Sequence, residues 1–235
     1  YAIVKTNYPK GVYMYNLASR AIYSEQDPEK AEEKLSAIIT DFNLDANKKE
    51  DLQKLENFYA QIARVYSLKN NNEKFEEYAN RVSNKATLAS LYNTYAWAGA
   101  EKNENSEFAA KISKKSLELI EAAKSEPRPA YVSSQEQYLK NLKTSYAAYA
   151  DTYALLMANL NRYDEAVKYQ EEAFANTNNI DPAANARYVN FLAKAKQHDK
   201  VVKFAEKYIK AGEGTEQMKQ DLQASYKGTL AFETY

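Results

Sequence analysis

The stretch Tyr59-Ala-Gln-Ile62-Ala63-Arg-Val-Tyr66, followed nine residues later by Phe75-x3-Ala79-x2-Val82, decides the fold of this chain. Large and small apolar residues recur there at steps of three and four, the spacing of one buried face on each of two consecutive helices. The same spacing returns around four other positions, so the sequence predicts a repeated helix pair. Those positions are Ala31, Ala109, Ala166 and Val201.

Five helix pairs and a closing helix account for most of the chain. We place the pairs at 12–41, 50–84, 87–123, 134–177 and 183–211, and the closing helix at 215–227, within a single helical domain spanning 1–235. Insertions near 45–51 and after 126 make the spacing of the pairs irregular. Because each pair can bury its apolar face only against its neighbours, such a repeat forms an array with one continuous core.

Local signals predict where individual helices begin. Asp27-Pro28 and Asp181-Pro182 each combine an N-cap acid with a proline at the first helical position. Ser133 and Glu136 have the spacing of a capping box, which predicts the start of a long helix over 134–160. Its expected buried stripe is Tyr138, Leu142, Tyr146, Tyr149, Tyr153, Met157 and Leu160.

Composition argues against several classes of function. The 32 basic and 32 acidic side chains leave no basic excess for a nucleic acid. The absence of Cys excludes disulfides, thiolate metal sites and cysteine nucleophiles, and there is no apolar run of about 18 residues to predict a transmembrane segment. Because the chain starts at Tyr1 without an initiator Met or a signal peptide and stops at Tyr235, we expect a piece of a longer protein or precursor.

The helix pairs resemble the tetratricopeptide repeat family, most closely in the second, fourth and fifth pairs. The resemblance implies an all-α, right-handed superhelix of about five helical hairpins plus a closing helix. It also implies a non-catalytic protein-interaction or scaffold module, which binds a protein or peptide partner on the concave face lined by the first helix of each pair. The family's first-helix glycine is replaced by Ser19, Ala63, Trp97, Ala154 and Val189.

A second resemblance concerns the stretches 92–97, 114–119 and 228–235. They are similar to helical regions that precede the redoxin domain in bacterial thioredoxin-like thiol-disulfide oxidoreductases of the cell envelope. The resemblance implies a location in the bacterial periplasm or cell envelope, with the cytoplasm as the alternative. It also implies that an attached C-terminal thioredoxin-like domain carries the catalytic Cys-x-x-Cys motif beyond Tyr235.

Tyrosine is very frequent, with 21 copies against eight Phe, and two interpretations are open. At packing positions the ring fills the space between helices and the hydroxyl reaches the edge of the core. Tyrosines off this register are candidates for an exposed groove, and they motivate the alternative of a glycan- or peptide-binding helical surface protein. The packing set includes Tyr15, Tyr59, Tyr66, Tyr153, Tyr188 and Tyr208, and the off-register set is Tyr13, Tyr23, Tyr92 and Tyr131.

Candidate ligand-binding residues are those that the register places inward on the first helices. Arg20 and Arg64 occupy equivalent places in successive pairs, so their guanidinium groups could hold an acidic peptide or a carboxylate. The competing interpretation is that each pairs with a neighbouring carboxylate or points to water. The full set is Tyr13, Asn16, Arg20, Tyr23, Arg64, Asp151, Asn159, Asn190 and Lys194, together with Thr94.

No residues form a recognisable catalytic, metal or cofactor-binding set, so we expect neither enzyme activity nor a cofactor. The single His198 cannot build a zinc site and is expected in a partly exposed structural position. Trp97 stands where the pattern has a small residue, which favours a core plug or an inter-pair contact over ligand stacking. Adjacent acids on second helices diverge by about 100° and are expected to be solvated. They are Glu32-Glu33, Glu76-Glu77 and Glu171-Glu172.

Overall fold

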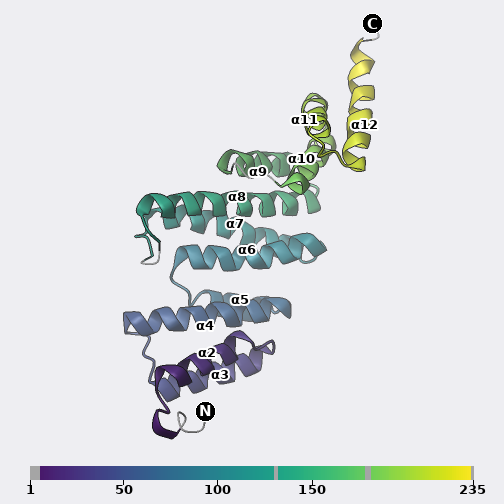
Figure 1. The fold of residues 1–235 in the computed structure, drawn as a ribbon. Helices are drawn as coiled ribbons and strands as arrows, with labels where there is room; N and C mark the ends of the chain where they lie inside the picture. Colours follow the sequence, from purple (N-terminus) through teal and green to yellow (C-terminus); the bar gives the residue numbers. More distant parts are fainter. Residues whose placement is uncertain (1–5, 130–131, 178–180, 234–235) are drawn as a thin grey trace. The chain divides into compact units, whose positions relative to one another are not determined.

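The computed structural model of the chain describes residues 6–129, 132–177 and 181–233, with 228–233 described by their backbone alone. All regular secondary structure in these ranges is helical, which confirms the all-α class (Figure 1). No helix in these ranges is both long and apolar enough to cross a bilayer. Contacts divide the chain into an N-terminal unit (Tyr1–Leu91) and a C-terminal unit (Tyr92–Tyr235), which we describe separately.

The N-terminal unit contains two helix pairs and the start of a third. Its helices are α2 (Val12–Tyr23), α3 (Pro28–Phe42), α4 (Lys49–Leu68), α5 (Asn72–Ala79) and the first part of α6 (Lys85–Lys102). From α2 to α5 each helix packs on the next, and α2 also contacts α4. The apolar residues that the sequence pattern places on the inner faces are fully buried there, among them Ile22, Ala31, Ile62 and Phe75.

The C-terminal unit contains the rest of α6, the helix that completes the third pair, two more helix pairs and a closing helix. Its helices are α7 (Ser106–Ala122), a 3₁₀ turn (Ala123–Ser125), α8 (Gln135–Asn159), α9 (Tyr163–Asn176), α10 (Pro182–Lys194), α11 (His198–Lys210) and α12 (Glu216–Glu233). From α7 to α12 each helix packs on the next, and α10 also contacts α8 and α12. The long helix predicted over 134–160 is confirmed as α8.

The structure confirms two of the predicted helix caps and corrects the third. The carboxylates of Asp27 and Asp181 accept hydrogen bonds from the first turns of α3 and α10. The predicted capping box at Ser133 is wrong, because Ser134 is the residue with the extended backbone next to the first helical residue. The hydroxyl of Ser134 accepts from the backbone N–H of Gln137 at 3.1 Å.

Asparagine closes several helices of both units where glycine is more usual. Four asparagines of the described ranges follow a helix and have a positive φ, in the left-handed region. They are Asn43 (51°), Asn70 (54°), Asn103 (53°) and Asn161 (59°). Asparagine tolerates this conformation better than most residues, because its short polar side chain can hydrogen-bond locally. A chain with only five Gly can therefore still make short connections between helices.

Tyrosines mainly serve packing. Tyr66, Tyr153, Tyr188 and Tyr208 are buried as predicted, whereas Tyr15 and Tyr59 are half-buried. Placing Tyr92 at the surface is wrong, because it shares the buried face of α6 with Tyr95 and Ala96. Tyr131 lies outside the described residues.

The hydroxyls of Tyr66, Tyr146 and Tyr188 donate to glutamates on second helices. The pairs are Tyr66–Glu32 at 2.8 Å, Tyr146–Glu172 at 2.6 Å and Tyr188–Glu171 at 2.8 Å. Burial and the adjacent carboxylate raise the pKa of each of these tyrosines well above its ordinary value. These three acids are therefore not only solvated, because each one also joins two helices.

Candidate functional site

A cavity of about 500 Å³ lies in the C-terminal unit, between α6, α8, α9 and α10. This volume is in the range of small-ligand pockets in proteins. Its walls combine small apolar side chains, two aromatic rings and a few polar groups. The lining residues are Trp97, Glu101, Thr144, Ala147, Ala148, Asp151, Gln170, Ala173, Phe174, Thr177, Asp181, Ala183, Ala184 and Arg187.

An ion pair between Asp151 of α8 and Arg187 of α10 forms the polar centre of the cavity wall. Nη2 of Arg187 lies 2.6 Å from Oδ2 and 2.8 Å from Oδ1 of Asp151. Gln170 of α9 donates from Nε2 to the same Oδ1 at 2.8 Å. Three helices therefore meet on one carboxylate, whose charge is neutralised by the guanidinium.

Trp97 of α6 forms the aromatic side of the same wall. The guanidinium carbon of Arg187 lies 5.9 Å from the centre of the indole ring, within the range of a cation–π contact. The ring is half-buried, so the inter-pair contact expected for Trp97 is present, but the ring also faces the cavity. Trp97 is the single tryptophan of the chain, which makes it a specific spectroscopic reporter for this cavity.

Two buried polar atoms at the cavity have no hydrogen-bond partner within the described part of the chain. They are Oε1 of Gln170, an acceptor, and Nε of Arg187, a donor. Gln170 is fully buried, and both side chains are bound to the same oxygen of Asp151. Unpaired buried polar atoms cost stability, so a group that both donates and accepts would be favoured at this point.

The rim of the cavity is acidic. Glu101 of α6 and Asp181 at the start of α10 are exposed lining residues. The carboxylate of Asp181 also caps its own helix, accepting from the backbone N–H of Ala183 at 2.9 Å. With the Asp151 charge neutralised by Arg187, the lining carries two acidic charges in excess.

The remaining predicted site residues of this unit either hydrogen-bond to a neighbouring helix or lie at the surface. Asn159 of α8 donates to the carbonyl of Ala100 on α6 at 2.8 Å, and Asn190 of α10 donates to Asp221 on α12 at 3.3 Å. These bonds tie neighbouring first helices together and are not aimed at the cavity. Lys194 is exposed in the last turn of α10.

Five predicted site residues lie in the N-terminal unit, on the exposed sides of α2 and α4. Tyr13, Asn16, Arg20 and Tyr23 follow one another along α2, and Arg64 lies on α4. The buried amide of Gln61 donates to the Tyr23 carbonyl at 3.1 Å and accepts from Nε of Arg64 at 3.2 Å. Both side chains are exposed and neither arginine forms an ion pair with a described residue, so their binding of an acidic ligand stays a prediction.

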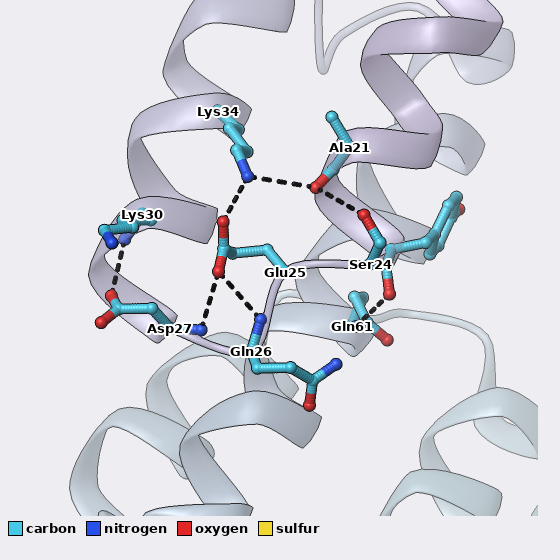
Figure 2. A network of polar contacts seen from close by, with 9 residues as sticks. Ala21, Ser24, Glu25, Gln26, Asp27, Lys30, Lys34 and Gln61 are labelled. Carbon is cyan, nitrogen blue, oxygen red and sulfur yellow. Dashed lines mark hydrogen bonds and ion pairs between the residues drawn. The ribbon is translucent and has the colours of Figure 1, made fainter.

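The turn beside Tyr23 is ordered by the Glu25 carboxylate (Figure 2). It accepts from the backbone N–H groups of Gln26 and Asp27, at 3.0 and 3.1 Å, and forms an ion pair with Lys34 of α3. The Lys34 hydrogen bond, with help from that of Asp27, lowers the pKa of the Glu25 carboxyl to about 2. These contacts fix the connection between α2 and α3 and contain no catalytic arrangement.

The cavity residues that the sequence did not predict include those that carry most of its charge and hydrogen bonding, Glu101, Gln170, Asp181 and Arg187. The one available signal was Trp97, a large ring at a position where the repeat has a small residue. His198 has the structural position expected for it, with Nδ1 at 3.2 Å from the hydroxyl of Ser225. In the described ranges no three potential metal ligands come together, so the cavity acids do not converge on one point.

Comparisons of the chain with protein-family models, with curated proteins and with solved structures give no match.

Proposed function

We propose that this chain is a non-catalytic, tetratricopeptide-like repeat module that binds an extended segment of a protein or peptide. The single observation that carries the proposal is the cavity walled by α6, α8 and α10, the first helices of three successive pairs, and by α9, the second helix of one of them. First helices line the concave, ligand-binding side in the repeat architecture that the sequence resembles. A cavity lined largely by first helices and centred on planar polar groups is suited to recognition.

The pattern of helix contacts supports the repeat architecture. Within each unit, consecutive first helices are in contact. In the N-terminal unit α2 contacts α4, and in the C-terminal unit α10 contacts both α8 and α12. A stack of helix pairs brings alternate helices together in this way. A right-handed superhelix is the arrangement that we propose for the pairs, and small-angle scattering of the chain would test it against a compact particle.

The chemistry of the cavity wall favours a peptide as the ligand. A peptide backbone offers carbonyl oxygens, which match the donor Nε of Arg187, and N–H groups, which match the acceptor Oε1 of Gln170. The alanines of α8, α9 and α10 leave room for the chain of the ligand beside the ring of Trp97. On the sequence resemblance, we propose that the module belongs to a bacterial cell-envelope protein with a thioredoxin-like domain.

A glycan is the second candidate ligand. The observation that favours it is the combination of Trp97 with the planar side chains of Asp151, Gln170 and Arg187 at one wall. A sugar ring can lie against an indole face, and its hydroxyls can both donate and accept.

The emission of Trp97 tests the proposal directly. We would titrate the whole chain with synthetic peptides and, separately, with neutral oligosaccharides, following tryptophan fluorescence and the indole N–H signal in NMR spectra. We expect saturable changes with peptides. The variant Ala148→Leu narrows the cavity from an exposed position on α8, and it should abolish those changes.

Ala37→Leu is the matched control, since Ala37 is exposed on α3 in the other unit. It should bind peptides as the unmodified chain does. If peptides leave the Trp97 signal unchanged at millimolar concentration, the peptide proposal is wrong, and a response to oligosaccharides alone would establish the second candidate.

A further inference from the structure

We propose that the cavity of the C-terminal unit selects a positively charged side chain, Lys or Arg, of the bound segment. This inference rests on the proposed function and names the chemistry of its ligand. Three carboxylates line the cavity, from Glu101, Asp151 and Asp181, against the single guanidinium of Arg187. A cation entering the cavity meets a net acidic lining, and an anion is repelled by it.

The positive charge of Arg187 is already neutralised within the chain. Its Nη2 binds both oxygens of Asp151 and its guanidinium lies over the ring of Trp97. An incoming carboxylate would have to compete with Asp151 for this group, at the cost of leaving that acid without its partner. Arg187 therefore does not make the cavity a carboxylate-binding site.

The start of α10 offers no compensating attraction for an anion. A free helix N-terminus attracts negative charge through its unpaired N–H groups. Here Pro182 occupies the first helical position and has no N–H, and the carboxylate of Asp181 accepts from the N–H of Ala183. The end of the helix is thus satisfied by an acid of the chain itself, and that acid adds to the negative rim.

Of the two unpaired atoms at the cavity wall, the acceptor of Gln170 requires a hydrogen-bond donor from the ligand. Gln170 is fully buried and lines the cavity, and its Oε1 acceptor has no partner in the described residues. An ammonium or guanidinium group carries several N–H donors and no acceptor. Such a group can give a hydrogen bond to Gln170, while its positive charge is attracted by the acidic lining.

The test uses four blocked hexapeptides, Gly-Ala-X-Ala-Ala-Gly with X as Lys, Arg, Gln or Glu, titrated into the whole chain with Trp97 fluorescence as the readout. We expect the Lys and Arg peptides to bind about tenfold more tightly than the Gln peptide at low ionic strength, with the Glu peptide weakest. Raising the salt from about 20 to about 300 mM should reduce the difference.

The variant Glu101→Gln/Asp181→Asn removes both uncompensated charges and conserves shape. Asparagine caps a helix as well as aspartate does, so α10 keeps its N-cap, which circular dichroism and thermal unfolding would confirm. We expect this variant to bind the Lys and Gln peptides equally. Glu118→Gln, an exposed change on α7 outside the cavity, is the control and should preserve the preference.

The outcomes distinguish a failure of the cationic selection from a failure of the proposed peptide binding. Equal binding of the Lys and Gln peptides, or a preference that survives in the double variant, overturns the cationic selection and leaves the peptide-binding function standing. A chain in which no peptide changes the Trp97 signal overturns both, as does a response to neutral oligosaccharides alone.

Discussion

The hydroxyl of Tyr66 donates to Oε1 of Glu32 at 2.8 Å and thereby joins α4 to the second helix of the preceding pair. Tyr66 is 5% exposed, so its ring packs in the core while its oxygen reaches the edge. Tyr188 and Glu171 repeat the relationship between α10 and α9. This double use of one side chain gives a physical reason for an array that contains so many tyrosines.

Replacing Tyr66 by Phe should lower the free energy of unfolding by about 1 kcal/mol, the typical net value of one hydrogen bond. Phe keeps the ring and its packing. The lost stability therefore measures the contribution of the hydroxyl, including the cost of leaving the partly exposed Glu32 carboxylate without its donor. Urea denaturation followed by circular dichroism measures the change. Tyr8→Phe, at a residue that is 67% exposed, is the control, and an equal effect in both variants would contradict the assignment.

Alkaline pH should destabilise the chain through the same tyrosines. Burial and neighbouring carboxylates raise the folded-state pKa of Tyr66, Tyr146 and Tyr188 above the ordinary value near 10. A raised pKa means that the stabilising contribution is complete below about pH 10 and is lost as pH rises toward the folded-state value. The free energy of unfolding should therefore be lower at about pH 11 than at about pH 9.

In a variant with all three tyrosines replaced by Phe, the free energy of unfolding should change less between about pH 9 and about pH 11. Tyrosinate absorbance gives a second check, because the three hydroxyls should ionise later than those at the surface. A stability that is constant between the two pH values would show that the hydroxyls are not held in the way described.

Glu25 should make the free energy of unfolding depend on pH at the acid end of the range. Its carboxyl pKa is lowered to about 2, chiefly by the hydrogen bond from Lys34. A lowered pKa contributes stability that is present above the ordinary value near 4.5 and is lost as pH falls from there toward 2. Carboxyl NMR titration should find this low value, and Lys34→Met should raise it, whereas Lys30→Met at a nearby exposed position should not.

The sequence predicted the parts of the fold that depend on periodicity and local signals. The steps of three and four along α8, and the aspartate–proline starts of α3 and α10, are properties of single segments. They are therefore visible without the tertiary structure. The position of Tyr92 was predicted wrongly because the register of α6 is set by which face its neighbours cover.

The candidate site was predicted only in part, because it depends on contacts between segments far apart in the sequence. Asp151, which the repeat register places inward on a first helix, lines the cavity, but its partner Arg187 is 36 positions away. Asn159 and Asn190 were placed on the same helices, yet their amides are used by Ala100 and Asp221. A repeat register identifies a helix face, and only the neighbouring helix decides whether a side chain on it is available to a ligand.

Asp151 and Arg187 should show strong energetic coupling in a double-mutant cycle of Asp151→Asn and Arg187→Met. Both side chains are largely buried, with 20% and 23% exposed, and two hydrogen bonds join them. We expect a coupling of about 1–2 kcal/mol from urea denaturation. The exposed pair Glu206–Lys210 is the control and should give about 0.3–0.5 kcal/mol, so similar couplings for both pairs would contradict the structure.

The two serines before α8 distinguish the sequence prediction from the structure. Ser134 accepts from the N–H of Gln137, so Ser134→Ala should lower the free energy of unfolding by about 1 kcal/mol, the usual cost of a lost N-cap. Ser133→Ala should have little effect, because Ser133 is exposed and precedes the cap. Thermal unfolding of the two variants measures the difference. A larger loss for Ser133→Ala would restore the capping box and move the start of α8 by one residue.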